Sequence, residues 1–559
     1  MLKVSRISTI GWMTLALLCL FELGVTSTAQ DGMEVQKFNG PYNVSGVVVS
    51  KVDGHPLPQT RVALAETNDR QKVQYVITGD DGRFVFPSVP AGKFSLTGRK
   101  RGFIPAAYDQ HDQFSTAIVT RGGLDTENLV LKLSPDGLIY GKILDEAGEP
   151  VRHATVTLYY DDHSAGIDQI RLARNATTDD LGAYEMSSLQ PGTYYVSATA
   201  QPWYAVHPPS QAEGSSDVRP AASAARSLDV AYPVTYYPDV TDAESATPIP
   251  LRGGERLEVD IHFNPVQALR LLFHVSGDRK RGYVFPQLFQ QSLDGSSSTN
   301  FMTGTNGVMI SPGLVEISGI PAGRYDIRLQ DANTSLQVRG VDVATQGQEV
   351  DTSTAEALSH VKLTVQVRGG ESPSEIVAVL RSQGKRGMQG ARLNANGEAE
   401  FQQVSAGDYE LVVFGIRKNF SIAQISVDGA KVSGRNIEVA PGSSVSVNAT
   451  ITPGSVAVDG VAKRAGKPFA GAMVVLVPRD VEGNRDLFRR DQSDQDGTFS
   501  LRDVVPGDYT LVAIENGWDL DWSKPEVIAV YAKHGRAVQV GETPGKPLQL
   551  ESPIEVVPK

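Results

Sequence analysis

The sequence predicts an all-β fold, a tandem array of small antiparallel β-sandwich modules. Three observations lead to this prediction. A pair of glycines ten residues apart recurs five times along the 559 residues, an aromatic residue follows each pair, and the 54 glycines and 32 prolines suit strands joined by turns. A repeated pattern of this kind is typical of repeat architectures. The chain is therefore predicted to be an array of one β unit and not a single large enzyme domain.

The repeat consists of two glycines and an aromatic residue two positions after the second glycine. The glycine pairs are Gly82/Gly92, Gly182/Gly192, Gly313/Gly323, Gly397/Gly407 and Gly497/Gly507. The aromatic residues are Phe94, Tyr194, Tyr325, Tyr409 and Tyr509. Apolar residues also stand four and seven positions after each first glycine, which indicates a core strand between two turns.

The first unit shows how each strand and turn is encoded. Residues 43–49 form a β-branched run, the Asp-Gly pair at 53–54 predicts a tight turn, and residues 61–64 predict a second strand. The turn at Gly82 follows the same logic, because glycine accepts a positive φ without steric cost. In the Pro-Ala-Gly segment at 90–92 the proline presets φ, and we expect the second glycine to take the left-handed conformation.

Alternate residues of these strands should form the core of each sandwich. In the first unit the side chains expected on one face are Phe84, Phe86, Phe94 and Leu96. Units two and five repeat both halves of this pattern, whereas units three and four keep the glycine pair and the aromatic residue and lose most of the first half. Alternating apolar residues at 129–133 and 257–263 predict closing strands, so adjacent units should join through short, stiff connections.

These patterns divide the chain into seven segments. We expect a signal peptide at 1–29, an N-terminal linker at 30–41, and β-sandwich modules at 42–137, 138–266, 267–357, 358–453 and 454–559. The second module carries an Ala/Ser/Pro-rich loop insertion at 208–226, which is predicted to be mobile.

The N-terminal residues predict export. Lys3 and Arg6 precede a short apolar run, and the small residues Ser27 and Ala29 fit the positions that a signal peptidase recognises. We expect cleavage after Ala29 and no transmembrane span afterwards, with an uncleaved anchor as the alternative. The single cysteine, Cys19, lies in this segment, so the exported chain would have no disulfide and no cysteine nucleophile. The expected location is the periplasm, the cell surface or the medium of a bacterium.

Composition and motifs favour a protein without catalysis. The formal net charge of −12 repels nucleic acid, so no nucleic-acid partner is expected. The sequence contains no His-Glu-x-x-His, no Gly-x-Ser-x-Gly and no phosphate-binding loop. Aspartates at 491, 494 and 496 partly fit a calcium loop, but Asp496 also belongs to the fifth hairpin turn. We therefore expect no enzyme, no catalytic residue, no metal and no cofactor.

Two histidine-aspartate clusters come closest to metal motifs. They are His111-Asp112 and the segment 161–163, which reads Asp-Asp-His. Both fall in predicted loops, and we interpret them as solvated side chains.

Aromatic residues in loops are the candidates for ligand binding, because indole rings cover the apolar faces of sugars while carboxylates bond their hydroxyls. The candidate residues are Trp518, Asp519, Asp521 and Trp522 after the last strong strand of unit five, and Trp203 and Tyr204 in the equivalent place after unit two. The alternative is that these rings cap a sandwich edge or fill a joint between modules.

The units also share a longer pattern. It reads apolar-x-Gly, then Gly-x-Pro, then Thr-x-x-Asp-Gly-x-Phe, then Leu-x-Pro-Gly-x-Tyr, and units one, two and five follow it most closely. This pattern resembles the carboxypeptidase regulatory-like domain, a family also described as transthyretin-like or carbohydrate-binding-like and related to the Cna B-type repeats of surface adhesins. The resemblance implies immunoglobulin-like or transthyretin-like sandwiches. Since the family's domains are accessory modules, it implies no activity of their own.

Three functional hypotheses follow. The first is an exported, non-enzymatic, multi-module binding or scaffold protein, with carbohydrate as the first ligand class to test. The second is an adhesion protein or cell-envelope spacer with protein partners and no small-ligand site. The third is a hydrolase with a site at a module junction. Glycans or cell-envelope proteins are thus the expected partners, and the exposure of Trp518 and Trp522 helps to separate the hypotheses.

Overall fold

The structure is a computed structural model, and it describes twelve stretches of the chain. These are residues 38–69, 71–208, 227–274, 286–298, 305–311, 313–330, 335–369, 373–382, 388–415, 420–454, 456–541 and 546–559. The expected signal peptide, most of the expected linker and the loop insertion from 209 onwards lie outside the described residues.

Module 1 consists of two facing sheets around one core. Its strands are β1 (Tyr42–Ser50), β2 (Arg61–Glu66), β3 (Val73–Ile77), β4 (Arg83–Val89), β5 (Gly92–Arg99), β6 (Phe103–Ile104), β7 (Ala106–Ala107), β8 (Ile118–Thr120) and β9 (Leu129–Pro135). One sheet has the order β4-β1-β9-β6, and the other has the order β3-β2-β5-β7 with β8 also on β5. The four core side chains expected from the sequence, Phe84, Phe86, Phe94 and Leu96, are all buried together.

Module 2 repeats this arrangement. Its elements are β10 (Gly137–Leu144), β11 (Thr155–Asp162), β12 (Gln169–Thr177), β13 (Ala183–Leu189), β14 (Gly192–Thr199), β15 (Val230–Ala231), β16 (Thr235–Tyr236), η1 (Ala243–Ser245), β17 (Ile249–Leu251), β18 (Arg256–Glu258), β19 (Ile261–His262) and β20 (Val266–Gln267). The sheets run β13-β10-β18, with β19 on β10, and β12-β11-β14-β16, with β17 on β14, while β15 pairs with β20.

Modules 3 and 4 each have two sheets as well. Module 3 contains β21 (Leu269–His274), β22 (Gln287–Gln291), β23 (Ser297–Ser298), β24 (Asn306–Ser311), β25 (Leu314–Ile320), β26 (Gly323–Gln330), β27 (Ser335–Val343), β28 (Gln348–Val350), η3 (Thr352–Thr354) and β29 (Glu356–Ala357). Module 4 contains β30 (Ser359–Val367), η4 (Pro373–Glu375), β31 (Ile376–Ser382), β32 (Met388–Arg392), β33 (Glu398–Val404), β34 (Gly407–Gly415), β35 (Phe420–Asp428), β36 (Lys431–Ser433), β37 (Asn436–Val439) and β38 (Ser444–Pro453). The sheet orders are β24-β25-β21-β28 and β23-β22-β26-β27-β29 in module 3, and β33-β30-β38-β35 and β32-β31-β34-β37-β36 in module 4.

Module 5 adds a short α-helix to the sandwich. Its elements are β39 (Val456–Arg464), β40 (Lys467–Pro468), β41 (Met473–Pro478), η5 (Arg485–Leu487), β42 (Arg489–Gln492), β43 (Thr498–Val504), β44 (Gly507–Ile514), η6 (Gly517–Asp519), α2 (Pro525–Ala532), β45 (Arg536–Val540), β46 (Leu548–Gln549) and β47 (Ile554–Val557). Because β47 pairs with both β39 and β44, its two sheets form one continuous path of strands. Proline starts α2, where its fixed φ suits the first helical turn.

Every module contains at least one parallel strand pair, which differs from the purely antiparallel sheets expected. The first strand pairs in parallel with the closing strand, as in β1 with β9, β10 with β18, β21 with β28, β30 with β38 and β39 with β46. Parallel pairing requires a crossover connection, and here the chain crosses through the opposite sheet before it returns. The closing strands predicted at 129–133 and 257–263 thus exist, with parallel pairing.

The first glycine of each pair occupies a tight turn with left-handed φ, as expected. The five residues are Gly82, Gly182, Gly313, Gly397 and Gly497, with φ between +68° and +84°. At Gly397 a Cβ would lie 2.4 Å from the carbonyl oxygen of Val365, whose amide donates to the Gly397 carbonyl at 2.7 Å. Glycine is therefore required both for φ and for the close approach of the first strand.

The second glycine has another role than the one expected. Among Gly92, Gly192, Gly323, Gly407 and Gly507, Gly407 alone has a positive φ. The aromatic ring two residues later lies against this glycine instead, so that a Cβ on Gly92 would come 3.4 Å from the Phe94 ring. The expectation of a left-handed turn here was wrong for four of the five glycines, and a Cβ at any of the five would lie 3.3–4.0 Å from the nearest ring atom, so the ring does not by itself require glycine.

The repeated tyrosine is held in the same way in four modules. Its hydroxyl donates to the carbonyl oxygen four residues upstream at 2.8 Å, in the pairs Tyr194–Gln190, Tyr325–Pro321, Tyr409–Ser405 and Tyr509–Val505. Module 1 has Phe94 at this position. There the Thr120 hydroxyl donates to the corresponding carbonyl of Pro90 at 2.5 Å, so the acceptor is satisfied by a different strand.

A β-bulge follows six positions after each first glycine. The bulged residues are Ser88, Ser188, Gly319, Gln403 and Asp503, all with φ between +54° and +85°. The register of the first strand shifts at the same place in all five modules. The bulge explains why apolar residues three positions apart, such as Phe86 and Val89, are both fully buried, which a regular strand does not allow.

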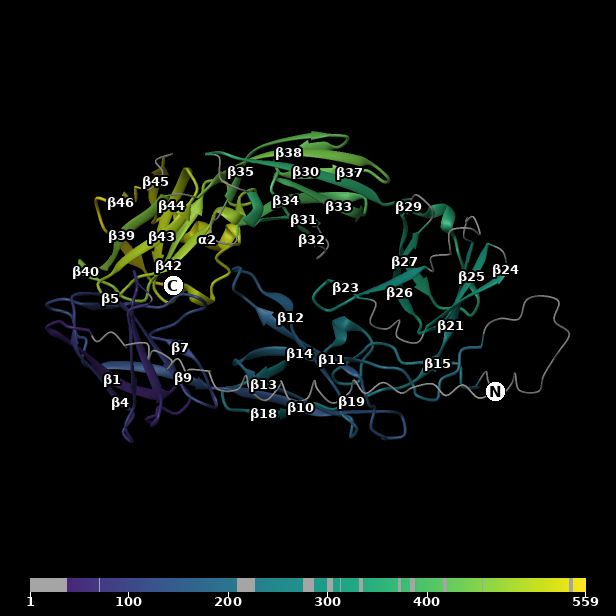
Figure 1. The fold of residues 1–559 in the computed structure, drawn as a ribbon, viewed down its shortest axis with the longest axis horizontal. Coiled ribbons are helices and arrows are strands. Elements are labelled where there is room, and N and C mark those ends of the chain that lie inside the picture. The colour runs from purple at the N-terminus through teal and green to yellow at the C-terminus, as the bar shows by residue number, and fades with distance from the viewer. Residues whose placement is uncertain are drawn as a thin grey trace, which may run out of the picture.

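The five modules close into a ring (Figure 1). Each has its own buried core, and module 5 has two. The connections are short: Asp136 alone separates β9 from β10, and Leu358 alone separates β29 from β30. Polar contacts join successive modules, including Arg270–Asp229, Arg339–Ala406 and Arg435–Asp486. Within the described ranges, no helix is long and apolar enough to span a membrane.

Candidate functional site

The ring is closed where module 5 meets module 1. The Lys93 ammonium lies 2.5 Å from Asp494 Oδ2 and donates to the Thr498 hydroxyl at 2.6 Å. Nearby, Arg121 Nη2 lies 2.7 Å from Asp496 Oδ2, and the Asp496 side chain is almost fully buried. The aspartates around the fifth hairpin turn thus bind two cations of module 1.

Two glutamines of module 5 bind module 1 directionally. The Gln492 amide donates to the Asp109 carbonyl at 2.5 Å and to the Thr116 hydroxyl at 2.8 Å. The Gln495 side-chain oxygen accepts from the Val119 amide at 3.1 Å. Gln492 and Thr116 are both buried. Such paired polar groups define one relative orientation of the two modules, because any other would leave buried groups without partners.

Arg490 of module 5 contacts modules 1 and 2 as well as its own module. Its side chain is 6% exposed, and its Nη1 lies 3.3 Å from Asp112 Oδ2 of module 1. Its Nη2 donates to the Ser164 carbonyl of module 2 at 3.0 Å, and its guanidinium lies 4.2 Å from the ring centre of Trp522. Burial lowers the pKa of Arg490, while the Asp112 carboxylate opposes that shift. We call the contact around Arg490 between modules 1, 2 and 5 the junction.

The two candidate tryptophans of module 5 lie in the junction. Trp518 stacks on His111 of module 1, with ring centres 5.0 Å apart and planes 7° apart, and its indole N–H donates to the Gly471 carbonyl at 3.3 Å. Trp522 is 8% exposed and packs in a buried cluster of module 5 beside Arg490. In the closed ring both side chains fill a joint between modules, which is the alternative stated for them above.

The neighbouring candidate carboxylates are engaged in ion pairs. Asp519 Oδ2 lies 2.5 Å from the Lys559 ammonium, and Asp521 Oδ2 lies 2.5 Å from the Lys524 ammonium. The hydrogen bond from Lys524 lowers the pKa of Asp521, and the hydrogen bond from Lys559 lowers that of Asp519. Asp519 therefore pairs within module 5, whereas Asp521 pairs with Lys524 and also lies 3.7 Å from His163 Nδ1 of module 2.

Module 2 reaches the junction through the loop at 163–168. His163 Nε2 is 2.9 Å from the Leu520 carbonyl, and His163 Nδ1 is 2.7 Å from Asp168 Oδ1. In the same loop the Gly166 carbonyl accepts from the Ser523 hydroxyl at 3.2 Å. The interpretation of His163 as a solvated loop residue was wrong, because the sequence pattern does not show that module 5 covers this loop.

The cluster at 111–112 needs the same correction. His111 stacks on Trp518, and Asp112 pairs with Arg490, so both residues belong to the junction. Sequence reasoning missed Arg490 altogether. The signal that could have revealed Arg490 is the run of three charged residues at 489–491 on an edge strand. Such a run is compatible with a polar interface as well as with a solvent-exposed edge.

The second pair of candidate aromatics lies in module 2. Trp203 is 87% exposed, and its ring is perpendicular to that of Tyr204, with centres 5.7 Å apart. The Tyr204 hydroxyl bonds the Glu146 carboxylate, which also accepts from the Tyr232 hydroxyl at 2.9 Å. Burial and the Glu146 carboxylate raise the pKa of Tyr204 to about 12. The Trp203 indole is thus exposed to solvent, whereas the neighbouring Tyr204 hydroxyl is bound by Glu146.

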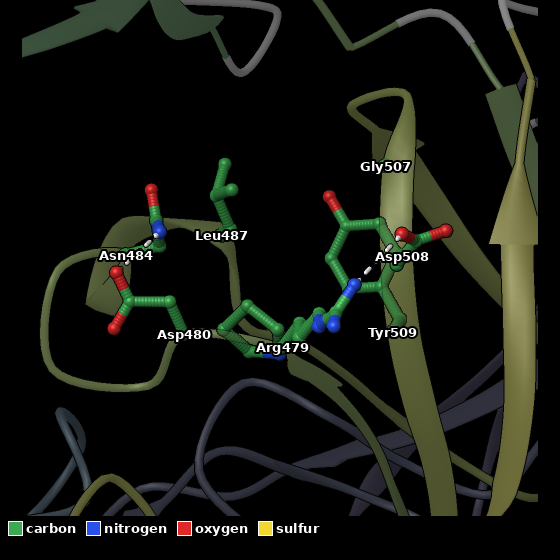
Figure 2. A pocket seen from close by; sticks show the side chains of 8 residues that line it. Arg479, Asp480, Asn484, Leu487, Gly507, Asp508 and Tyr509 are labelled. Atoms are coloured by element: carbon green, nitrogen blue, oxygen red, sulfur yellow. Dashed lines mark hydrogen bonds and ion pairs between the residues drawn. The ribbon is translucent and has the colours of Figure 1, made fainter.

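Module 5 also has a shallow pocket of about 510 Å³ (Figure 2). It is lined by Pro478, Arg479, Asp480, Asn484, Leu487, Gly507, Asp508 and Tyr509. The Arg479 guanidinium lies 3.8 Å from Asp508, and the Asn484 amide donates to Asp480 at 3.3 Å. The polar groups of this pocket are therefore paired with one another, and no candidate residue predicted for ligand binding lines it.

Comparison with solved structures finds pilin subunits and one other bacterial protein at low similarity. The Bacillus anthracis TIE protein is 10% identical over 73% of this chain and 73% of its own, with a TM-score of 0.17. The minor pilin GBS52 of Streptococcus agalactiae is 14% identical over 40% of this chain and 97% of its own, with a TM-score of 0.21. The major pilin subunit BcpA of Bacillus cereus is 12% identical over 57% and 99%, with a TM-score of 0.14. Scores this low support no functional inference.

Sequence comparison identifies the domain type of the first two modules. No curated protein matches the chain. The family model of the carboxypeptidase regulatory-like domain matches residues 43–131 and 139–221, which fall in modules 1 and 2. Its first match spans most of β1 to β9, and its second covers β10 to β14 and ends before the closing strands β17 to β19 of module 2. The resemblance stated from the repeat is confirmed for modules 1 and 2: the chain carries two tandem carboxypeptidase regulatory-like domains.

Proposed function

We propose that the protein is an exported, non-enzymatic scaffold whose five modules are held as a closed ring. The observation that carries this proposal is Arg490, which joins module 5 to module 1 through the Asp112 carboxylate and the Phe114 ring, and to module 2 through the Ser164 carbonyl. A closed ring holds the loops of all modules in constant relative positions. Rigid presentation of loops is how β-sandwich proteins bind partners, so glycans or cell-envelope proteins are the proposed partners.

The polar contacts beside Arg490 support a ring over an extended spacer. Module 5 contributes the anions Asp494 and Asp496, and module 1 contributes the cations Lys93 and Arg121. Complementary charges select one docking partner and disfavour others. A spacer with independent modules would have no use for these pairs, whereas a scaffold needs them to remain closed.

Small-angle scattering of the exported chain tests the proposal. We expect a compact particle whose radius of gyration increases when Arg490→Ala removes the contact with modules 1 and 2. Arg489→Ala is the matched control, because Arg489 donates to the carbonyls of Asp486, Phe488 and Asp503 within module 5. The control should lower the stability of module 5 and leave the radius of gyration unchanged. Rod-like scattering of the wild-type chain would refute the closed scaffold and favour the spacer.

A second candidate function is carbohydrate binding at Trp203. The indole of Trp203 is 87% exposed, in contrast to the buried Trp522, so it can stack on a sugar face in the closed ring. We expect any glycan-array signal of the full chain to disappear in Trp203→Ala. Leu181→Ala, which removes another exposed apolar side chain of module 2, is the control and should keep the signal. A signal that survives Trp203→Ala would contradict binding at this residue.

A further inference from the structure

His163 lies between groups that only accept hydrogen bonds. Its Nε2 faces the Leu520 carbonyl of module 5 at 2.9 Å, and its Nδ1 faces Asp168 Oδ1 of its own loop at 2.7 Å. A second carboxylate oxygen, Asp521 Oδ1 of module 5, lies 3.7 Å from the same Nδ1. A neutral imidazole carries one N–H, whereas the imidazolium carries two. Both partners can therefore be bound at once only when His163 is doubly protonated.

We propose that His163 is a proton-operated latch of the ring, which ties the loop 163–168 of module 2 to the loop 517–524 of module 5 while it carries two protons. The proposal rests on the closed ring proposed above. When His163 loses one proton, either the Leu520 carbonyl or the Asp168 carboxylate faces a nitrogen lone pair. The remaining proton stays on Nδ1, which faces the Asp168 carboxylate, so the contact between modules 2 and 5 loses the hydrogen bond from Nε2 to the Leu520 carbonyl and the attraction to Asp521.

The charged groups around His163 favour its cationic form. Its own module contributes Asp161, Asp162 and Asp168, of which Asp162 pairs with Arg171 at 2.8 Å. Those of modules 1 and 5 are the pairs Asp521–Lys524, Asp519–Lys559 and Asp112–Arg490, together with Glu526 beside Lys524. Carboxylates outnumber cations in this set, so the local field stabilises an imidazolium.

The direction of the pH dependence follows from these contacts. Burial lowers the pKa of His163, but the hydrogen bonds to Leu520 and Asp168 and the charges of Asp168 and Asp521 outweigh it, and the net shift is upward from 6.5. A group whose folded-state pKa is raised adds stability that is present below the ordinary pKa and lost as pH rises through the raised one. The ring should therefore be held more tightly in mildly acid than in alkaline solution.

The other histidine of the junction provides a matched control. His111 stacks on Trp518, and its Nδ1 lies 3.1 Å from the side-chain oxygen of Gln492. This oxygen belongs to a neutral amide, so a neutral His111 with its proton on Nδ1 satisfies it. His111→Gln should weaken the contact between modules 1 and 5, and protection of residues 517–524 should still fall with rising pH because His163 is retained.

Hydrogen exchange of the full chain in EDTA tests the latch. The reporter is the peptide that contains Ser523, whose amide lies 3.4 Å from the Gly166 carbonyl across the two modules. After correction for intrinsic exchange, we expect the protection of residues 517–524 to fall about tenfold or more from pH 5.5 to pH 8.5, as for the loss of a hydrogen bond to a charged group. In His163→Gln, which keeps one donor for Leu520 and cannot titrate, the profile should be flat.

Scattering at both pH values separates failure of the latch from failure of the ring. An extended wild-type particle at pH 5.5 would refute the closed ring itself. A compact particle with the same protection at both pH values, or an unchanged profile in His163→Gln, would overturn the latch and leave the ring standing. Protection that appears only when EDTA is omitted would mean that a metal ion holds His163, Asp168 and Asp521 together, and it would also overturn the latch.

Discussion

At the scale of single residues, the repeat contains a strained position that varies in identity. The bulge after each first glycine has a left-handed backbone, yet Gly319 is the one glycine among the five residues and the others are serine, glutamine or aspartate. A left-handed conformation costs a residue with a Cβ about 1–2 kcal/mol. Since the core residues that flank the bulge, such as Phe86 and Val89, are fully buried, their packing holds this conformation in place.

Replacing Gln403 with glycine should stabilise module 4. The φ of Gln403 is +57°, so glycine relieves strain that outweighs its extra backbone entropy, and we expect a gain of about 0.5 kcal/mol in the free energy of unfolding. Gln402→Gly is the control, because this exposed neighbour lies in the same strand without a positive φ, and glycine there should cost a similar amount. Denaturant unfolding that shows the same sign for both variants would contradict the strain argument.

Tyr409→Phe should cost module 4 about 1 kcal/mol. The substitution removes the 2.8 Å hydrogen bond to the Ser405 carbonyl and leaves that acceptor without its partner. Tyr75→Phe, in which the lost hydroxyl belongs to a half-exposed ring of module 1, should be close to neutral. Calorimetry or denaturant unfolding measures the stability of both variants. An equal loss in the two would show that the hydrogen bond from Tyr409 to the Ser405 carbonyl does not stabilise module 4.

At the scale of elements, loops define the contact surfaces that the strands only support. The groups that meet in the junction come from β42 and the turn after it, from the loop 517–524, and from the loops at 109–116 and 163–168 of modules 1 and 2. Gly166 shows how closely these loops fit, because a Cβ there would lie 2.5 Å from the Trp522 ring. The close contact between the loop 163–168 and the loop 517–524 therefore depends on the absence of a side chain at Gly166.

Gly166→Ala should separate module 5 from module 2. The new methyl group collides with Trp522, so we expect faster hydrogen exchange in residues 517–524. Gly148→Ala is the matched control: its φ of +78° compares with +74° at Gly166, and a Cβ there meets nothing within 4 Å. Both variants should lose about 1–2 kcal/mol of local stability from backbone strain. If exchange at 517–524 rises equally in both, the contact with Trp522 is not the cause.

The strands could be predicted from the sequence because their signals are local. Alternating residues at 43–49 and 61–64 are β1 and β2, and the first glycines have the φ that their turns require. The bulge was missed although it left a trace, since buried residues three positions apart, such as Phe86 and Val89, cannot share one face of a regular strand. An odd spacing between two core positions is the signal that would have revealed it.

The junction could not be predicted because its partners are far apart in the chain. Lys93 and Asp494 are separated by 401 positions, and each looks like an ordinary charge beside a turn. Trp518 is equally ambiguous in sequence, because a tryptophan in a polar loop suits a sugar platform and a module joint alike. The choice depends on what covers the ring, and here His111 does.

At the scale of the whole molecule, closure depends on charge pairing between the first and last modules. Lys93→Glu places a second carboxylate next to that of Asp494, whose side chain is 16% exposed. Repulsion between the two carboxylates should open the ring and increase the radius of gyration. Combining Lys93→Glu with Asp494→Lys restores opposite charges and should return the particle toward its compact size. Small-angle scattering decides the matter, and a double variant as extended as the single one would contradict the pairing.

A ring closed by contacts between complete modules also has a mechanical consequence. Tension applied between Phe38 and Lys559 loads the junction first, because the junction joins the two ends of the described chain while every core lies within a module. Rupture of the junction would release the length of the three intervening modules without unfolding any of them. The protein would thus extend in one reversible step at low force. The junction would open before any module unfolds, and the modules would remain folded.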